Sequence, residues 1–144
     1  MDPEIVFSVA GVVSMLGWLV LLASPWFPQA ADRIAGAVVP GVLATGYFAL
    51  LVLFPSSQGG FGSFAEITEL FDQPWALMAG WIHFLAFDLV VGAWICRVAR
   101  RETIRFVWVV PCLLLTFLVG PLGFLVFAGV RAVARRRSAS AGER

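Results

Sequence analysis

One segment of the sequence places a histidine and an acid inside an apolar stretch. His83 and Asp88 both lie in the apolar run of residues 75–96, and His83 is the only histidine of the chain. An acid at membrane depth costs about 2.5 to 3.5 kcal/mol even on lenient insertion scales, so a carboxyl group there needs a compensating role. A carboxyl and an imidazole beside an apolar cavity could act as proton donor and acceptor. We therefore take Asp88 and His83 as the candidate catalytic residues.

A structural role for the same two residues is also open. At 100° per residue, His83 and Asp88 are about 140° apart around a helix, so each should face a different interhelical seam. There they could hydrogen bond to polar groups of neighbouring helices, namely Thr45, Tyr47, Thr116 or the Trp108 indole. For Asp88 both interpretations stay open. For His83 the structural one is favoured, because a single histidine without a charged neighbour is weak evidence for catalysis.

Aromatic and small residues near this pair are the candidate substrate contacts. Trp81 and Asp88 share a helix face, and Gly92 lies one turn beyond Asp88. Such a face could admit a neighbouring helix or a flat apolar ligand. The candidate substrate-binding residues are Tyr47, Trp81, Phe84, Phe87, Gly92 and Thr116.

No metal or cofactor is expected, because one histidine and two cysteines in apolar segments do not supply the ligands of a zinc site.

The composition places these residues in a membrane. Of the 144 residues, 60% are hydrophobic and only 13% are charged, and the mean hydropathy is +0.92. A globule of this size has too much surface to bury so much apolar area in water. The net charge of +1 gives no reason to expect a nucleic-acid partner, and membrane lipids are the expected surroundings.

Four apolar stretches have the length of a membrane span. They cover residues 5–23, 35–54, 75–96 and 106–130, and each meets the roughly 20 helical residues that cross the hydrocarbon layer. Because lipid offers no hydrogen-bond partner to the backbone, the spans should be helices. Between the second and third, Ser63 and Glu66 form a capping-box pattern that predicts a short amphipathic helix. The predicted fold is an all-α integral membrane bundle of four transmembrane helices within one domain, residues 1–137, followed by a polar tail, residues 138–144.

The last apolar stretch contains two interruptions. Pro111 and Gly120-Pro121 predict a bend, because proline removes a backbone donor and clashes with the preceding turn.

With four spans, five arginines fall on each side of the membrane, so the positive-inside rule does not decide the orientation. If the chain instead turned back at Gly120-Pro121, both arginine clusters could share one face. That re-entrant arrangement is left as an alternative.

Two sequence segments resemble a known family. Residues 80–95 read GWIHFLAFDLVVGAWI and residues 111–123 read PCLLLTFLVGPLG. In this order they are similar to the motifs of abscisic-acid-deficient-four-like membrane proteins, and weaker similarity extends to Pro25-Trp26 and Gly46-Tyr47. Plant members of that family are associated with forming neoxanthin from violaxanthin in plastids. This resemblance implies a carotenoid-like apolar ligand, and it does not by itself assign roles to individual residues.

Two functions follow as hypotheses. The first is a redox-neutral isomerase, or an accessory to one, acting on a carotenoid-like lipid; opening an epoxide with loss of a neighbouring proton needs only a proton donor and an acceptor. The second is a non-catalytic scaffold that binds pigment, lipid or another membrane protein. Whether the chain is an enzyme stays undecided. Whether it forms a homo-oligomer or binds a membrane-protein partner also stays open. The absence of an arginine- and serine-rich transit segment favours a bacterial cytoplasmic membrane.

Overall fold

The protein is helical throughout the residues that the structure describes. The computed structural model describes the backbone of residues 2–142 and the side chains of residues 2–136. Over this range there is no β-strand, in agreement with the predicted all-α class. In chain order the elements are α1 (Pro3–Leu22), α2 (Pro28–Arg33), the π-helical turn η1 (Ile34–Val38), α3 (Val39–Leu53), α4 (Phe64–Phe71), α5 (Pro74–Arg101), α6 (Phe106–Val119) and α7 (Pro121–Gly142).

Three helical stretches are long and apolar enough to cross a membrane. They are Pro3–Leu22, Pro28–Leu53 and Pro74–Arg101, with 20, 26 and 28 residues. The second consists of α2, η1 and α3 joined without a break. Each meets the length of about 20 residues that the hydrocarbon layer requires. The first three predicted spans are therefore each present as a long apolar helix, with somewhat wider bounds than the sequence suggested.

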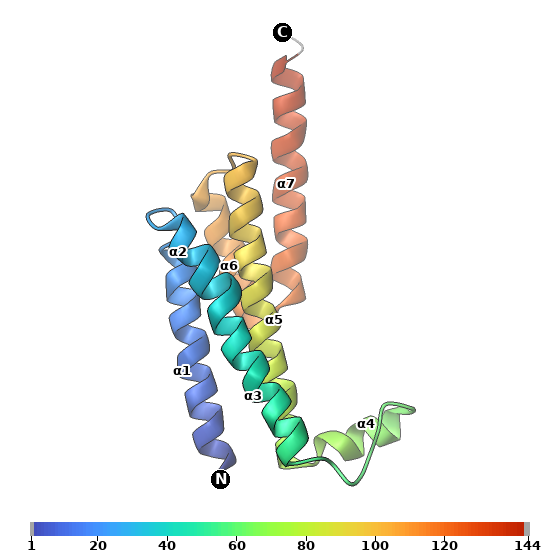
Figure 1. Ribbon diagram of the computed structural model, residues 1–144. Coiled ribbons are helices and arrows are strands. Elements are labelled where there is room, and N and C mark those ends of the chain that lie inside the picture. The colour runs from blue at the N-terminus through green and yellow to red at the C-terminus, as the bar shows by residue number, and fades with distance from the viewer. Residues whose placement is uncertain (1, 143–144) are drawn as a thin grey trace.

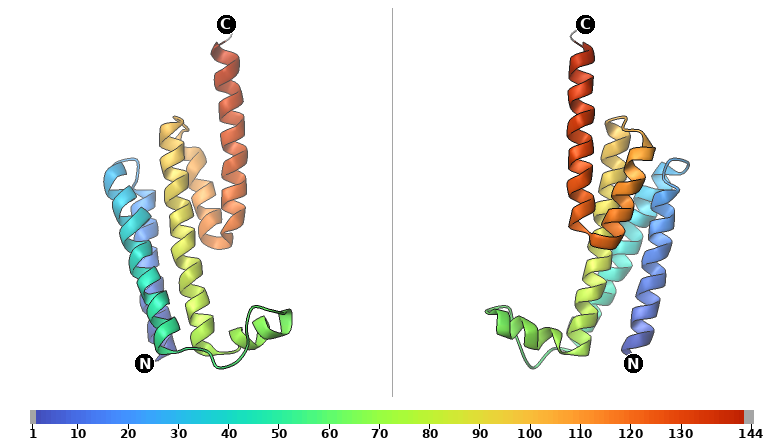
Figure 2. Two further views of the ribbon diagram at one scale, coloured as in Figure 1. Left: turned by 45° about the vertical axis from the view of Figure 1, so that its right-hand side comes forward. Right: turned by 180° about the vertical axis from the view of Figure 1, so that it is seen from behind.

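Local sequence signals set several helix ends. The Asp2 side chain accepts a hydrogen bond from the Glu4 amide at 2.9 Å and caps α1. Before α4, Ser63 Oγ accepts from the Glu66 amide at 3.2 Å, and the Glu66 carboxylate accepts from the Gly62 amide at 3.1 Å. This is the predicted capping interaction, and the predicted short helix between the second and third spans is confirmed. The helix α4 contains no buried residue and projects sideways from the end of the bundle (Figure 2).

The last apolar segment differs from the predicted fourth span. Helix α6 ends at Val119, Gly120 takes a positive φ of +46°, and α7 begins at Pro121. Figures 1 and 2 show α6 running back along α5 and α7 rising again beside it. The prediction of one continuous spanning helix over residues 106–130 is therefore wrong, because the chain reverses direction at Gly120-Pro121, the position at which the re-entrant alternative turns back. The four-span bundle becomes three long helices and a helical hairpin.

The length of α6 explains the hairpin. Its 14 residues extend only about 21 Å at 1.5 Å per residue, less than the roughly 30 Å of hydrocarbon. Glycine accepts the positive φ at the reversal without a Cβ clash, and proline suits the first position of the next helix. The other interruption, Pro111, stays inside α6. The predicted bend thus occurs at Gly120-Pro121, where it becomes a full reversal.

Helix α5 occupies the centre of the molecule. It packs against α1 and α3 on one side and against the hairpin arms α6 and α7 on the other. Two glycines allow α1 to approach closely: a Cβ on Gly17 would come within 3.0 Å of Leu89, and one on Gly92 within 3.0 Å of Trp18. Small residues at helix crossings are the usual means of close packing in membranes. The candidate residues on α5 are therefore held by neighbours on several sides.

The reversal places the arginines at one end of the bundle. Arg33 ends α2, Arg97 to Arg101 end α5, Arg105 precedes α6, and α7 returns to the same end. There Glu102 accepts hydrogen bonds from both Arg131 and Arg135 of α7, at 2.6 Å in each case. We call this end the arginine face. It is defined by Arg33, Arg97, Arg100, Arg101, Arg105, Arg131 and Arg135. The opposite end carries no arginine within the described residues. Its charged side chains are the acids Asp2, Glu4, Glu66, Glu69 and Asp72.

The hairpin predicts that the two chain termini lie on opposite sides of the membrane. A single cysteine introduced at Asp2 and another at Ser138 should react oppositely with a membrane-impermeant maleimide in intact cells. The native Cys96 and Cys112 are buried and should contribute little background. Labelling of both introduced cysteines from the same side would instead support four full crossings.

The Glu102 ion pairs predict an acid-sensitive hairpin. Hydrogen bonds from Arg131 and then Arg135 lower the pKa of Glu102 from 4.5 to about 2. Because the folded-state pKa is depressed, the stabilisation is complete above pH 4.5 and is lost as the pH falls towards 2. Thermal unfolding in detergent should show a lower midpoint for Glu102→Gln than for the natural protein at neutral pH, with the difference shrinking over this window. A difference between the two that does not change with pH would contradict this role.

Candidate functional site

Helix α5 directs the two candidate catalytic residues into separate seams. Asp88 lies against the hairpin at Gly120, whereas His83 lies beside Tyr47 of α3 with 5.5 Å between ring centroids. This separation is the one that their positions on a helix predict. The sequence candidates therefore form two groups, one around each residue, and not a single cluster.

Asp88 is buried beside the tip of the hairpin. Its exposed fraction is 8%, and its Oδ2 atom has no hydrogen-bond partner among the described residues. The other oxygen, Oδ1, would lie 2.9 Å from a Cβ placed on Gly120. A buried polar atom without a partner is costly, and acids inside membrane helices usually mark functional positions. The carboxyl group is available to hold a proton or to accept a hydrogen bond from a ligand.

The hairpin tip beside Asp88 is built by close backbone contacts. The Gly120 amide donates to the Thr116 carbonyl at 2.9 Å, and the Gly123 amide donates to the Gly120 carbonyl at 3.1 Å. Thr116 is fully buried, and its hydroxyl donates to the Cys112 carbonyl at 2.8 Å. A Cβ on Gly123 would overlap Thr116 Oγ1 and the Cys112 carbonyl. Thr116, a candidate substrate contact, thus lies inside the hairpin and packs its two arms together.

His83 borders a cavity between α3, α4 and α5. The imidazole is exposed, stacks on Phe87 with 4.5 Å between centroids and lies near Tyr47. The adjoining cavity, which we call the α3–α5 cavity, has a volume of about 330 Å³. Its lining is mostly apolar: Tyr47, Leu50, Leu51, Phe54, Ser56, Phe61, Leu70, Phe71, Trp75, Ala76, Ala79, Gly80 and His83. An apolar ligand could enter it from lipid, with His83 and Tyr47 as polar contacts.

Trp81 and Phe84 form a second hollow on the hairpin side of α5. Trp81 stacks on Phe84 at 5.7 Å and on Phe7 of α1 at 5.6 Å. A shallow hollow of about 290 Å³, lined by Phe71, Leu77, Gly80, Trp81 and Phe84, lies there; we call it the α4–α5 hollow. Phe84 also reaches Gly120, since its Cε2 would be 3.5 Å from a Cβ on that glycine. Phe84 therefore borders both the hollow and the surroundings of Asp88.

Some site residues have no clear signal in the sequence. Gly120 lies beside Asp88 only because the chain reverses there. Helix α4 contributes Phe71 to the lining of both the α3–α5 cavity and the α4–α5 hollow. The apolar face of the predicted amphipathic helix was the available hint for Phe71. Gly92, by contrast, packs against Trp18 and Leu21 of α1, so its position is explained by helix contact. No group of three or more His, Cys, Asp or Glu side chains that could hold a metal occurs within the described part of the chain.

A family model matches most of this architecture. It covers residues 5–127, from α1 into α7, and includes His83, Asp88 and the hairpin tip. Its description is ABA DEFICIENT 4-like. The chain belongs to the ABA DEFICIENT 4-like family. The resemblance seen in the two sequence segments is thereby confirmed. Neither the curated proteins nor the solved structures contain a match to the chain.

The Gly120 position predicts a specific sensitivity at the site. In Gly120→Ala the side chain would meet Asp88 Oδ1 and would also adopt a positive φ, which costs about 1 to 3 kcal/mol in non-glycine residues. We expect a lower unfolding midpoint in detergent. Gly11→Ala is the matched control, because a Cβ there meets nothing within 4 Å and alanine favours a helix. Equal midpoints for the two variants would contradict the described geometry of the tip.

Proposed function

We propose that this ABA DEFICIENT 4-like protein is an intramembrane isomerase that acts on a carotenoid-like apolar lipid, with Asp88 as its proton-transferring group. The observation that carries the proposal is the buried, unpartnered Oδ2 of Asp88 at a break between two helices. Family membership supports the ligand class, through the association of plant members with neoxanthin formation. The aromatic linings of the α3–α5 cavity and the α4–α5 hollow support an apolar ligand entering from lipid.

The proposed reaction requires no electron acceptor. A protonated Asp88 gives its proton to an epoxide oxygen, and the carbon–oxygen bond breaks as the hydroxyl forms. The resulting carboxylate removes a proton from a neighbouring carbon, and a new carbon–carbon π-bond forms. Asp88 ends protonated again, and the product is an isomer of the substrate. A single carboxyl group can perform both steps in sequence if the substrate shifts between them.

The charge distribution supports an orientation. Arginine-rich segments near membrane helices stay on the cytoplasmic side, so the arginine face would be cytoplasmic and the acidic end with α4 would be external. The proposed location is a bacterial cytoplasmic membrane. In that orientation the α3–α5 cavity and the α4–α5 hollow open in the outer half of the bilayer, because both include residues of α4.

A non-catalytic binding protein is the second candidate. It is favoured by the separation of His83 from Asp88, because His83 lies beside Tyr47 of α3 whereas Asp88 lies against Gly120 of the hairpin. In that case the α3–α5 cavity would hold a pigment or lipid through its aromatic lining, and His83 would serve only as a contact. Such a protein could present its ligand to a membrane-protein partner or to a second copy of the chain.

Substitutions of Asp88 should separate the two functions. In Asp88→Asn the side chain keeps its shape but cannot transfer a proton, so conversion should be abolished while the thermal midpoint in detergent stays near that of the natural protein. In Asp88→Leu conversion should also be lost, and stability should be equal or higher, because no hydrogen bond is broken and a buried polar group is removed. The carotenoid profile of cells that make each variant measures conversion.

Gly11→Ala is the control, since a Cβ there meets nothing within 4 Å and Gly11 lines neither the α3–α5 cavity nor the α4–α5 hollow, and it should retain conversion. An unchanged profile for Asp88→Asn, in cells where deletion of the gene does change the profile, would eliminate Asp88 as an acid/base group and favour the binding protein. If Asp88 instead has a structural partner, Asp88→Leu should lose about 0.6 to 2 kcal/mol of stability, the range for interhelical hydrogen bonds in membranes.

A further inference from the structure

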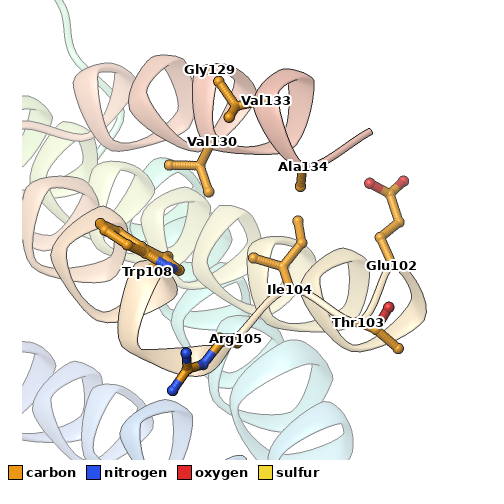
Figure 3. A pocket seen from close by; sticks show the side chains of 9 residues that line it. All are labelled: Glu102, Thr103, Ile104, Arg105, Trp108, Gly129, Val130, Val133 and Ala134. Carbon is orange, nitrogen blue, oxygen red and sulfur yellow. The ribbon is translucent and has the colours of Figure 1, made fainter. Parts of the chain in front are cut away.

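A cleft separates the two arms of the hairpin at the arginine face. The arms meet at Gly120 and are further apart near the start of α6, where a cavity of about 470 Å³ lies between α7 and the α5–α6 loop. We call it the α6–α7 cleft. Its lining residues, all labelled in Figure 3, are Glu102, Thr103, Ile104, Arg105, Trp108, Gly129, Val130, Val133 and Ala134. It is distinct from the surroundings of Asp88 and from the two hollows near α4.

The interior of the cleft is apolar. Figure 3 shows Trp108 and Ile104 pointing from the α6 side towards Val130 on α7. Gly129 lines the cleft, and a Cβ there would meet no atom within 4 Å. An unfilled apolar cleft between membrane helices suits a hydrocarbon chain.

The rim of the cleft is positively charged. In Figure 3 the Glu102 carboxylate lies at one end of the cleft near Ala134, and it binds Arg131 through Nε and Nη2 and Arg135 through Nε and Nη2. Two guanidinium groups thus share one carboxylate, which leaves a net charge of +1. Within the described residues, the hydrogen bonds of both arginines to Glu102 use Nε and Nη2, which leaves Nη1 of each available as a donor. Arg105 also lines the cleft, but in Figure 3 its guanidinium group points away from α7.

We propose that the α6–α7 cleft binds one anionic phospholipid, with an acyl chain between the arms and the phosphate at the guanidinium groups of Arg131 and Arg135. Basic clefts between membrane helices on the cytoplasmic side bind anionic head groups in this way, and arginine forms strong charge-assisted hydrogen bonds to phosphate. A free anion would not use the apolar walls, and a zwitterionic lipid would gain less from the net positive rim. The lipid acts as a wedge that keeps the two arms apart at the arginine face. This inference does not depend on the isomerase proposal.

Native mass spectrometry of the full chain in detergent tests the site, with phosphatidylglycerol and phosphatidylcholine as probes. We expect one retained phosphatidylglycerol and weaker retention of phosphatidylcholine. Gly129→Leu should fill the cleft without a clash and remove the preference for phosphatidylglycerol. Gly41→Leu is the matched control, since Gly41 is also free of neighbours within 4 Å but lies on α3 outside the cleft, and it should bind as the natural protein does.

Arg135→Gln tests the phosphate contact while leaving the Glu102–Arg131 pair in place. Removing one charge near the membrane surface should weaken phosphatidylglycerol binding about fivefold and leave phosphatidylcholine binding unchanged. Glycerol phosphate should not compete with the lipid, because it lacks an acyl chain. Equal retention of the two lipids by the natural protein, or undiminished phosphatidylglycerol binding by a folded Gly129→Leu variant, would overturn the proposal.

Discussion

The structure depends on a chain reversal at Gly120-Pro121, within an apolar stretch of the chain. Backbone amides and carbonyls at membrane depth find no partner in lipid, so irregular backbone survives there only if protein covers it. At the hairpin tip, Gly120 and Gly123 donate to carbonyls within the hairpin itself, and both glycines are buried. The absence of a side chain on Gly123 lets the two arms close on Thr116. Helix α5 supplies the remaining cover.

This constraint accounts for the position of α5 and for the setting of Asp88. Because α6 has only 14 residues and α5 has 28, α6 covers only part of α5, and the aromatic residues Trp81 and Phe84 border a hollow instead of a helix contact. The reversal also returns α7 to the end where α5 stops, where Glu102 can bind two of its arginines. The arrangement of charge along the membrane normal is thus a result of the turn at Gly120.

Much of the fold and part of the site could be predicted from the sequence. The three long spans follow from apolar length, and the helix α4 follows from the Ser63–Glu66 capping pattern, because both signals are local. The separation of His83 from Asp88 follows from helical geometry alone. The fourth span was mispredicted because an apolar stretch of 25 residues has the same composition whether it crosses the membrane once or turns back. Two signals in the sequence, the interruption at Gly120-Pro121 and the tie of five arginines against five, point to a reversal, and neither decides between a bend and a full turn.

The sequence by itself determined that the chain is a helical membrane protein, that its intramembrane acid and histidine lie on α5, and that it resembles the family to which it belongs. The tertiary structure decided which groups surround those side chains. It placed Gly120 against Asp88, α4 beside the α3–α5 cavity, and Arg131 and Arg135 on Glu102. These contacts join residues far apart in the chain, and they exist because packing, and not local propensity, fixes where helices meet in a membrane.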